Sequence, residues 1–322
     1  MKINKEIASA STAVRAVMLG HAVGDALGVP VEFCSREELD ASPVRDMRGW
    51  GTYPVPEGCW SDDTSMSLAT LDNLKNGLLY EDIMQGFEQW YFRGEYTPTG
   101  RAFDVGGTCR VAIERYAAGA PISQCGLSDE WSNGNGSLMR IHPVALYLYF
   151  NGYSESDGLE EIYRASSLTH AHERSRVACG IYALLLWALL DDPRHESIRR
   201  ALKRASEIYG DNGEASAFGR LLSSDGEALA RTPREDIIGD GYVVHTLEAA
   251  VWCLFNSENY GECVLDAVNL GDDTDTTAAV AGGLAGARYG LDKIPDEWLA
   301  ALKKRDYIAQ ICDRATEAWF VK

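Results

Sequence analysis

The sequence predicts an all-α fold that forms a single compact domain of a dozen or so helices. Apolar residues recur at three- and four-residue spacing along most of the 322-residue chain, which is the period of a helix with one buried face. Alternating patterns of strand length are nearly absent, and the best of them, Tyr-Pro-Val at 53–55, is too short to build a sheet. No linker, low-complexity tract or repeat interrupts residues 1–322, so we expect one domain.

The helical pattern can be followed from one end of the chain to the other. Each segment presents an apolar face, and the stretch after 277, rich in alanine and glycine, also has the composition of a buried helix. The amphipathic segments lie at 11–28, 65–78, 80–92, 176–190, 241–255, 260–271 and 306–320.

Glycines recur every fourth residue in two of these segments. Each glycine costs a helix about 1 kcal/mol relative to alanine, so a stripe of them predicts helices that pack backbone to backbone. The same spacing occurs in dimerising membrane spans, but Asp25, Arg288 and the short apolar length argue against that interpretation. The stripes are Gly20, Gly24 and Gly28 in the first segment and Gly282, Gly286 and Gly290 near the end.

Composition narrows the classes of partner. The formal net charge is −18, which repels phosphate backbones and anionic lipids, so we expect neither a nucleic-acid nor a membrane partner. Apolar runs such as 180–190 are too short to span a bilayer, and residues 1–20 lack the apolar core of a signal peptide. The eight cysteines are scattered without a Cys-x-x-Cys pair, which predicts a cytoplasmic protein without disulfides or a zinc finger.

Two acidic clusters stand out, Ser-Asp-Asp-Thr-Ser at 61–65 and Gly-Asp-Asp-Thr-Asp-Thr-Thr at 271–277. Either could cap a helix, where a carboxylate contributes about 0.3–1 kcal/mol through the helix dipole. Two carboxylates about 4 Å apart at an effective dielectric near 20 repel by about 4 kcal/mol, which exceeds that gain. A bound cation would offset the repulsion. Carboxylate and hydroxyl oxygens suit Mg²⁺, Mn²⁺ or Ca²⁺ rather than zinc, and ligands from two sides suit a two-metal site.

Three other motifs compete for these residues. An EF-hand loop starting at Asp273 would need glycine and glutamate where Ala278 and Leu284 stand, so it is excluded. Asp273 to Thr277 fits the Asp-x-Asp-x-Thr pattern of aspartyl-phosphate phosphatases, but that motif follows a strand of a parallel sheet. The histidines of His-Ala-His-Glu at 170–173 could bind a transition metal, although no cysteine or further histidine lies nearby.

Seven segments in a fixed order resemble the ADP-ribosylglycohydrolases, the family of the dinitrogenase-reductase-activating glycohydrolase and of the ADP-ribosylarginine and ADP-ribosylserine hydrolases. Each segment alone is a weak signal, whereas the ordered set covers nearly the whole chain. The segments are GHAVGDALGVPVEF (20–33), WSDDTSM (60–66), FDVGGTCR (103–110), NGNGSLMRIHPVA (133–145), SSLTHAH (166–172), GYVVHTLEAAVWC (241–253) and NLGDDTDTTAAVAGGLAGA (269–287).

The resemblance implies an all-α domain with two Mg²⁺ or Mn²⁺ ions at the floor of a cleft for ADP-ribose. Asp272, which stands where many members carry glycine, is expected to be an outer or capping residue. Glu32 and Asp104 are expected to be catalytic, one of them as acid or base. The implied metal ligands are Ser61, Asp62, Asp63, Asp273, Asp275 and Thr276, and the implied substrate-binding residues are Gly134, Asn135, Gly136, Ser137 and His170.

The implied activity is hydrolysis of the bond between ADP-ribose and a protein side chain, with arginine favoured because Phe-Asp-Val-Gly-Gly at 103–107 resembles the arginine-directed members. The partners would be an ADP-ribosylated protein and the product ADP-ribose. Serine-linked and small ADP-ribosyl compounds remain alternatives. A relative that acts as an immunity or binding protein, blocking an ADP-ribosyltransferase toxin, is an alternative of another class.

Overall fold

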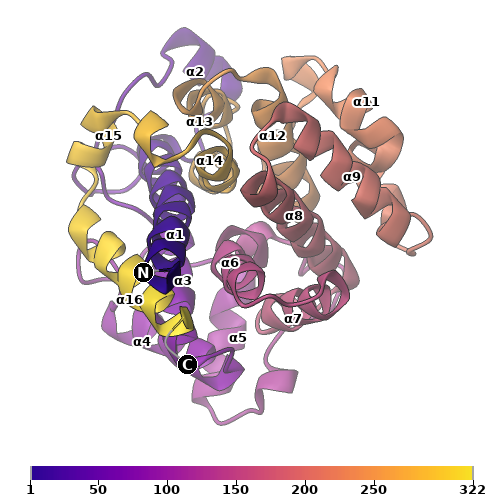
Figure 1. Cartoon of the computed structure of the whole chain (residues 1–322). Coiled ribbons are helices and arrows are strands. Elements are labelled where there is room, and N and C mark those ends of the chain that lie inside the picture. The colour runs from indigo at the N-terminus through magenta and orange to yellow at the C-terminus, as the bar shows by residue number, and fades with distance from the viewer. Residues whose placement is uncertain (1, 321–322) are drawn as a thin grey trace.

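The computed structural model describes residues 2–320 and confirms the all-α prediction. Within this range no strand forms, and β-pairing is limited to two isolated bridges, Leu127 with His170 and Gly134 with Tyr242. Figure 1 shows α15 and α16 along one side of the molecule and α9 and α11 along the other, with α1, α14 and α8 between them. The fold is therefore a helical assembly around a few central helices.

The helices follow one another along the chain, and the longest connections between them lie before α3, α5 and α6. The first third contains α1 (Lys2–Gly28), α2 (Arg36–Ala41), α3 (Asp62–Asn73), α4 (Tyr80–Arg93) and α5 (Gly107–Ala117). The middle contains α6 (His142–Phe150), α7 (Glu155–Ser167), α8 (Glu173–Asp191), α9 (His195–Tyr209), α10 (Gly219–Leu222) and α11 (Glu227–Ala230). The last third contains α12 (Val243–Asn256), α13 (Tyr260–Val268), α14 (Thr274–Tyr289), α15 (Asp296–Ala301) and α16 (Arg305–Phe320). All eight cysteines are free thiols.

Helices α1 and α14 pack backbone to backbone, as the glycine stripes predict. A Cβ atom added to Gly20 would lie 2.5 Å from the carbonyl oxygen of Gly282, and one added to Gly24 would lie 2.1 Å from that of Ala278. A Cβ on Gly28 would lie 2.3 Å from Cα of Asp275. This close packing brings the end of α1 against the start of α14, where the second acidic cluster lies.

Gly290 does not take part in this packing. It follows the last residue of α14 with a φ of 91°, a left-handed conformation that glycine adopts at little cost. The prediction that it belongs to the packing stripe is therefore wrong, because this residue ends the helix.

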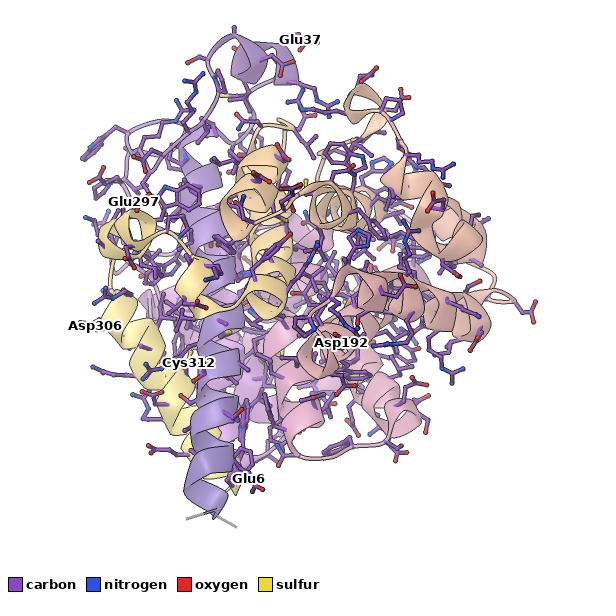
Figure 2. The ribbon with its side chains drawn as sticks, turned by 45° about the horizontal axis from the view of Figure 1, so that its top comes forward. Glu6, Glu37, Asp192, Glu297, Asp306 and Cys312 are labelled. Carbon is purple, nitrogen blue, oxygen red and sulfur yellow. The ribbon has the colours of Figure 1, made fainter. Side chains whose placement is uncertain are left out.

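Helix α1 is longer than its predicted segment. The stretch Glu6–Val31 has the length and composition of a membrane span. The prediction that all apolar runs are too short to span a bilayer did not include this stretch, because polar residues interrupt it. In the structure 94% of its most apolar 18-residue window is buried inside the protein, as in the core helix of a globular fold. Figure 2 shows Glu6 near the start of α1 and Cys312 on the neighbouring α16. The two helices are joined by Ser11 and Arg15, which each donate to Asp313 at 2.8 Å.

We expect Gly24→Ala to lower the free energy of unfolding by about 1–3 kcal/mol, the usual cost of overpacking. The added methyl group would meet a backbone carbonyl that cannot move aside, and this outweighs alanine's better helix propensity. Denaturant unfolding measures the change. Gly219→Ala is the matched control, because no atom lies within 4 Å of its added Cβ. Equal stabilities of the two variants would contradict the packing argument.

Candidate functional site

The two acidic clusters meet because α3 and α14 begin beside the end of α1. Ser61 is the N-cap of α3: its hydroxyl oxygen accepts a hydrogen bond from the backbone N–H of Asp63 at 3.3 Å and donates to Oδ2 of Asp63 at 2.9 Å. Asp273 holds the same position before α14, but its side chain makes no capping hydrogen bond. Capping thus explains Ser61 and leaves the aspartates of the second cluster unexplained.

Asp25 of α1 completes this arrangement and is not among the residues predicted for the site. It is fully buried and accepts hydrogen bonds from the backbone N–H of Ser61 at 2.8 Å and from the hydroxyl of Thr64 at 2.6 Å. Burial raises the pKa of Asp25 to about 7. An aspartate in the apolar stretch that ends this helix was the available signal, because a carboxylate is rarely buried without a role.

Two groups of carboxylates lie close enough to share cations. Single oxygens of Asp25, Asp63 and Asp275 lie within 4.8 Å of one another, and so do oxygens of Glu32, Asp104 and Asp275. Asp275 belongs to both groups, so the groups adjoin. Among the described residues no histidine belongs to such a group, which leaves the transition-metal interpretation of 170–173 without support.

The carboxylates of the site are electrostatically unfavourable without a cation. Burial, followed by the charges of Asp104 and Asp273, raises the pKa of Glu32 to about 9. Burial and neighbouring carboxylates also hold the pKa values of Asp62, Asp63 and Asp275 well above the usual range. Four buried carboxylate oxygens lack a hydrogen-bond partner among the described residues: Oε2 of Glu32, Oδ1 of Asp63, Oδ1 of Asp273 and Oδ2 of Asp275. Such orphaned oxygens fit hard divalent cations.

A cavity of about 220 Å³ opens over these carboxylates. Ser61, Asp63 and Asp275 lie beneath its surface, fully buried or nearly so. Thr276 joins the two clusters, because its hydroxyl donates to Oδ2 of Asp63 at 3.3 Å. The predicted site residues that line the cavity are Glu32, Asp62, Asp104, Gly134, Asn135, Gly136, His170, Asp273 and Thr276.

The loop at 134–137 forms one wall of the cavity. The side-chain amide of Asn135 donates to Oδ2 of Asp273 at 2.9 Å, and its backbone N–H donates to the carbonyl of Gly241 at 3.0 Å. A Cβ on Gly136 would lie 2.8 Å from Sγ of Cys109, so the backbone passes closer than any other residue allows. The hydroxyl of Ser137 is fully buried in the core rather than lining the cavity, and its Oγ lies 2.9 Å from Oγ of Ser166.

Asp104 is held in place by Tyr53, a residue that was not predicted to belong to the site. The hydroxyl of Tyr53 donates to Oδ1 of Asp104 at 2.8 Å, and its ring packs against Phe103 with centroids 5.0 Å apart. The neighbouring Thr52 donates its hydroxyl to the carbonyl of Glu32 at 2.6 Å. The loop that contains Thr52 and Tyr53 therefore positions both predicted catalytic acids. The short Tyr-Pro-Val pattern in this loop gave no indication of this role.

Asp272 supports the structure of the site through its backbone hydrogen bonds. It has a φ of 60° and an exposed side chain, and its carbonyl accepts from the N–H of Phe33 at 2.7 Å while its own N–H donates to Cys34 at 2.9 Å. These bonds hold the segment after Glu32 against the second cluster. The phosphatase alternative finds no support, because residues 2–320 contain no strand to precede Asp273.

Comparison with known proteins decides the family. Residues 8–322 match the family described as ADP-ribosylglycohydrolase. This chain belongs to that family. It is 34% identical over 310 residues to the ADP-ribosylarginine hydrolase Tri1 of Pseudomonas putida (strain GB-1), an alignment that covers 94% of this chain and 78% of that protein. It is 32% identical to the ADP-ribosyl-[dinitrogen reductase] glycohydrolase of Rhodospirillum rubrum, with 88% of each chain covered.

A solved structure supports the same assignment for this ADP-ribosylglycohydrolase. That structure, described as an ADP-ribosylglycohydrolase-related protein complex, matches with a TM-score of 0.79 and 33% identity, covering 96% of this chain and 99% of the other. The resemblance drawn from the seven ordered segments is therefore confirmed for the family and for the fold.

Proposed function

We propose that this chain is a metal-dependent hydrolase that removes ADP-ribose from modified protein side chains, with N-linked ADP-ribosylarginine as its preferred substrate. The observation that carries the proposal is the pair of carboxylate groups sharing Asp275 at the floor of a cavity. The preference for arginine is supported by the 34% identity to the Pseudomonas ADP-ribosylarginine hydrolase and by the 31% identity to that of Serratia proteamaculans (strain 568).

Two divalent cations, Mg²⁺ or Mn²⁺, fit the donor set. When bound, such ions neutralise the crowded carboxylates, orient sugar hydroxyls and lower the pKa of water. Asp25 accepts a hydrogen bond from the backbone at the start of α3, and Asp275 belongs to both groups of carboxylates. The residues proposed to hold the ions are Ser61, Asp62, Asp63, Asp273, Asp275 and Thr276, with Glu32 and Asp104 beside them.

Glu32 and Asp104 supply the acid and the base. Glycoside cleavage needs one carboxyl group that carries a proton for the leaving atom and one that accepts a proton from water. Without a bound cation, burial and then the charge of Asp104 raise the pKa of Glu32 to about 9, and we propose that Glu32 keeps enough of this shift beside the cations to act as the acid. Oδ1 of Asp104 accepts a hydrogen bond from the Tyr53 hydroxyl, and the other carboxylate oxygen, Oδ2, is proposed to accept the proton from water as the base.

The remaining cavity residues bind the ADP-ribose portion. In the loop from Gly134 to Ser137 the backbone N–H of Asn135 is used by the carbonyl of Gly241. The other backbone N–H groups are proposed to bind the ligand, because glycine lets the main chain approach it closely, as in anion-binding loops elsewhere. His170 lies beside this loop on the cavity wall. We propose a cytoplasmic enzyme whose substrate is an ADP-ribosylated protein and whose product is ADP-ribose, without a nucleic-acid or membrane partner.

The test is release of ADP-ribose from ADP-ribosylarginine protein, measured with Mn²⁺ and after EDTA treatment. We expect turnover with the metal and at least a hundredfold loss after chelation, because the cations stabilise the transition-state charge. A serine-linked substrate assayed in parallel distinguishes the linkage. Equal turnover with EDTA would refute metal dependence. Tight binding of an ADP-ribosyltransferase without metal and without turnover would favour an immunity protein instead.

A further inference from the structure

A buried arginine lies behind the cavity without a carboxylate partner. Arg140 is fully buried at the end of the short 3-10 helix Asn135–Arg140, and its guanidinium lies 4.7 Å from the ring centroid of Phe87. Its hydrogen bonds go to the carbonyl of Ala165 at 3.3 Å and to Oγ1 of Thr169 at 2.7 Å. A buried cation is costly unless its donors are used, so its link to a neutral hydroxyl calls for an explanation.

The hydroxyl of Thr169 transmits this contact to the cavity. Oγ1 of Thr169 lies 2.8 Å from Nδ1 of His170, and His170 lines the cavity. Arginine can only donate, so the Thr169 oxygen accepts from Arg140 and retains a single proton of its own to donate. The Cys109 thiol also lies near Thr169, but sulfur is a weak acceptor and this thiol donates to the carbonyl of Gly136 at 3.7 Å. We therefore assign the Thr169 proton to Nδ1 of His170, the stronger of the two acceptors near it.

The backbone of His170 is held on both sides. The N–H of Leu127 donates to the carbonyl of Thr169 at 2.9 Å, and the N–H of Ala171 donates to the carbonyl of Leu127 at 2.7 Å. The hydroxyl of Ser166 donates to the carbonyl of His170 at 3.0 Å. The backbone that carries the imidazole is therefore fixed beside the cavity.

The opposite edge of the ring faces the glycine loop. A Cβ on Gly136 would lie 3.0 Å from Cε1 of His170 and 3.5 Å from Nε2, and one on Gly134 would lie 3.8 Å from Nε2. Both glycines line the cavity with His170. Burial, and then the charge of Arg140, lowers the pKa of His170 to about 3, so the ring is neutral and carries one proton. With Nδ1 acting as acceptor, that proton resides on Nε2.

We propose that Arg140 and Thr169 are positioning residues that hold His170 as the neutral Nε2–H tautomer, so that its N–H donates to an acceptor oxygen of ADP-ribose. The inference rests on the proposed function for the identity of the ligand, but the tautomer itself follows from the hydrogen bonds of this chain. The arrangement makes His170 a hydrogen-bond donor toward the cavity whose state does not change across neutral pH.

The first test is the ¹⁵N NMR spectrum of the six histidines, with His170 assigned by comparison with His170→Gln. We expect the wild-type chain to show a neutral ring protonated on Nε2. In Thr169→Val, which keeps the side-chain shape but removes the hydroxyl, we expect the His170 signals to shift toward a mixture of tautomers. Thr169→Ser restores the hydroxyl and should restore the wild-type signals. A wild-type ring protonated on Nδ1 overturns the inference even if Thr169→Val fails to fold.

The second test is calorimetric binding of ADP-ribose in the presence of Mn²⁺. We expect Thr169→Val to bind about tenfold more weakly, the usual effect of losing one well-oriented hydrogen bond. Thr316→Val is the matched control, because Thr316 is an equally buried threonine on α16 that bonds only to Cys312 of its own helix. Unchanged affinity in Thr169→Val overturns the positioning role. Failure of the wild-type chain to bind ADP-ribose overturns the proposed function, while the NMR spectrum still decides the tautomer.

Discussion

Replacing Asp275 with asparagine is expected to lower the rate of ADP-ribose release by about 10³-fold or more, the loss seen when a main electrostatic element of an active site is removed. Asp275 is the one carboxylate that belongs to both groups of potential ligands in the described part of the chain. Asparagine keeps its size but removes the charge on which both cation positions would depend. Steady-state turnover at saturating Mn²⁺ measures the effect, and calorimetry measures the loss of metal binding.

The fold should survive this substitution. Asp275 is buried, and its Oδ2 has no hydrogen-bond partner. Burial, followed by the charges of neighbouring carboxylates, raises its pKa, so the metal-free fold disfavours its charge and a neutral amide removes that penalty. We expect the Tm of metal-free Asp275→Asn to equal or exceed that of the wild-type chain. Asp272→Asn is the matched control, because Asp272 is exposed in the same cluster and asparagine tolerates its left-handed backbone. Comparable activity of the two variants would refute the shared-ligand role.

The second large effect is the dependence of metal-free stability on pH. The pKa values of Asp25 and Glu32 are raised to about 7 and about 9, mainly by burial, whereas unfolded carboxyl groups titrate near about 4. Between these values the folded chain binds more protons than the unfolded chain. The stability from these groups is fully present below about pH 4 and is lost as the pH rises through about 7 and about 9.

Divalent cations should reverse this loss, because they bind the ionised carboxylates of the folded state only. At about 100 times its Kd a cation adds about 2.7 kcal/mol per site. We therefore expect the Tm with EDTA to fall from pH 5 to pH 9 and the gain in Tm with Mn²⁺ to grow over the same range. Thermal unfolding at each pH measures both. Glu32→Gln should reduce the dependence of Tm on pH in EDTA. A gain in Tm with Mn²⁺ that does not change with pH would contradict the proposal that the cations bind these carboxylates.

Local pattern was sufficient for the helical class, because an apolar face at helical spacing forces a helix to pack on other helices. The segments that became α4, α8, α12 and α16 could be read in this way to within a few residues. Helix α6 could not, because its residues from His142 to Leu148 are all buried, and a helix that is apolar on all sides carries no periodic signal.

Some features of the site could also be predicted from the sequence, and others could not. The sequence shows crowded aspartates before an apolar helix and glycines at four-residue spacing. Both features predict a specific contact, because charge repulsion and lost helix propensity each need an offsetting interaction. These features, with the seven ordered segments, were enough to indicate the family and most residues that line the cavity. Whether Gly290 packs or ends a helix depended on its backbone conformation, which the spacing alone does not specify.

The tertiary packing determines which residues far apart along the chain come into hydrogen-bond contact. Asp25 joins the site because α1 passes behind the first turn of α3, and Tyr53 joins it because its loop reaches Asp104. Arg140 reaches His170 only through Thr169. Hydrogen bonds act over about 3 Å, and nothing in the order of residues states which distant atoms will come that close. Composition and periodicity select the kind of structure, and the folded chain alone chooses the neighbours of each polar atom.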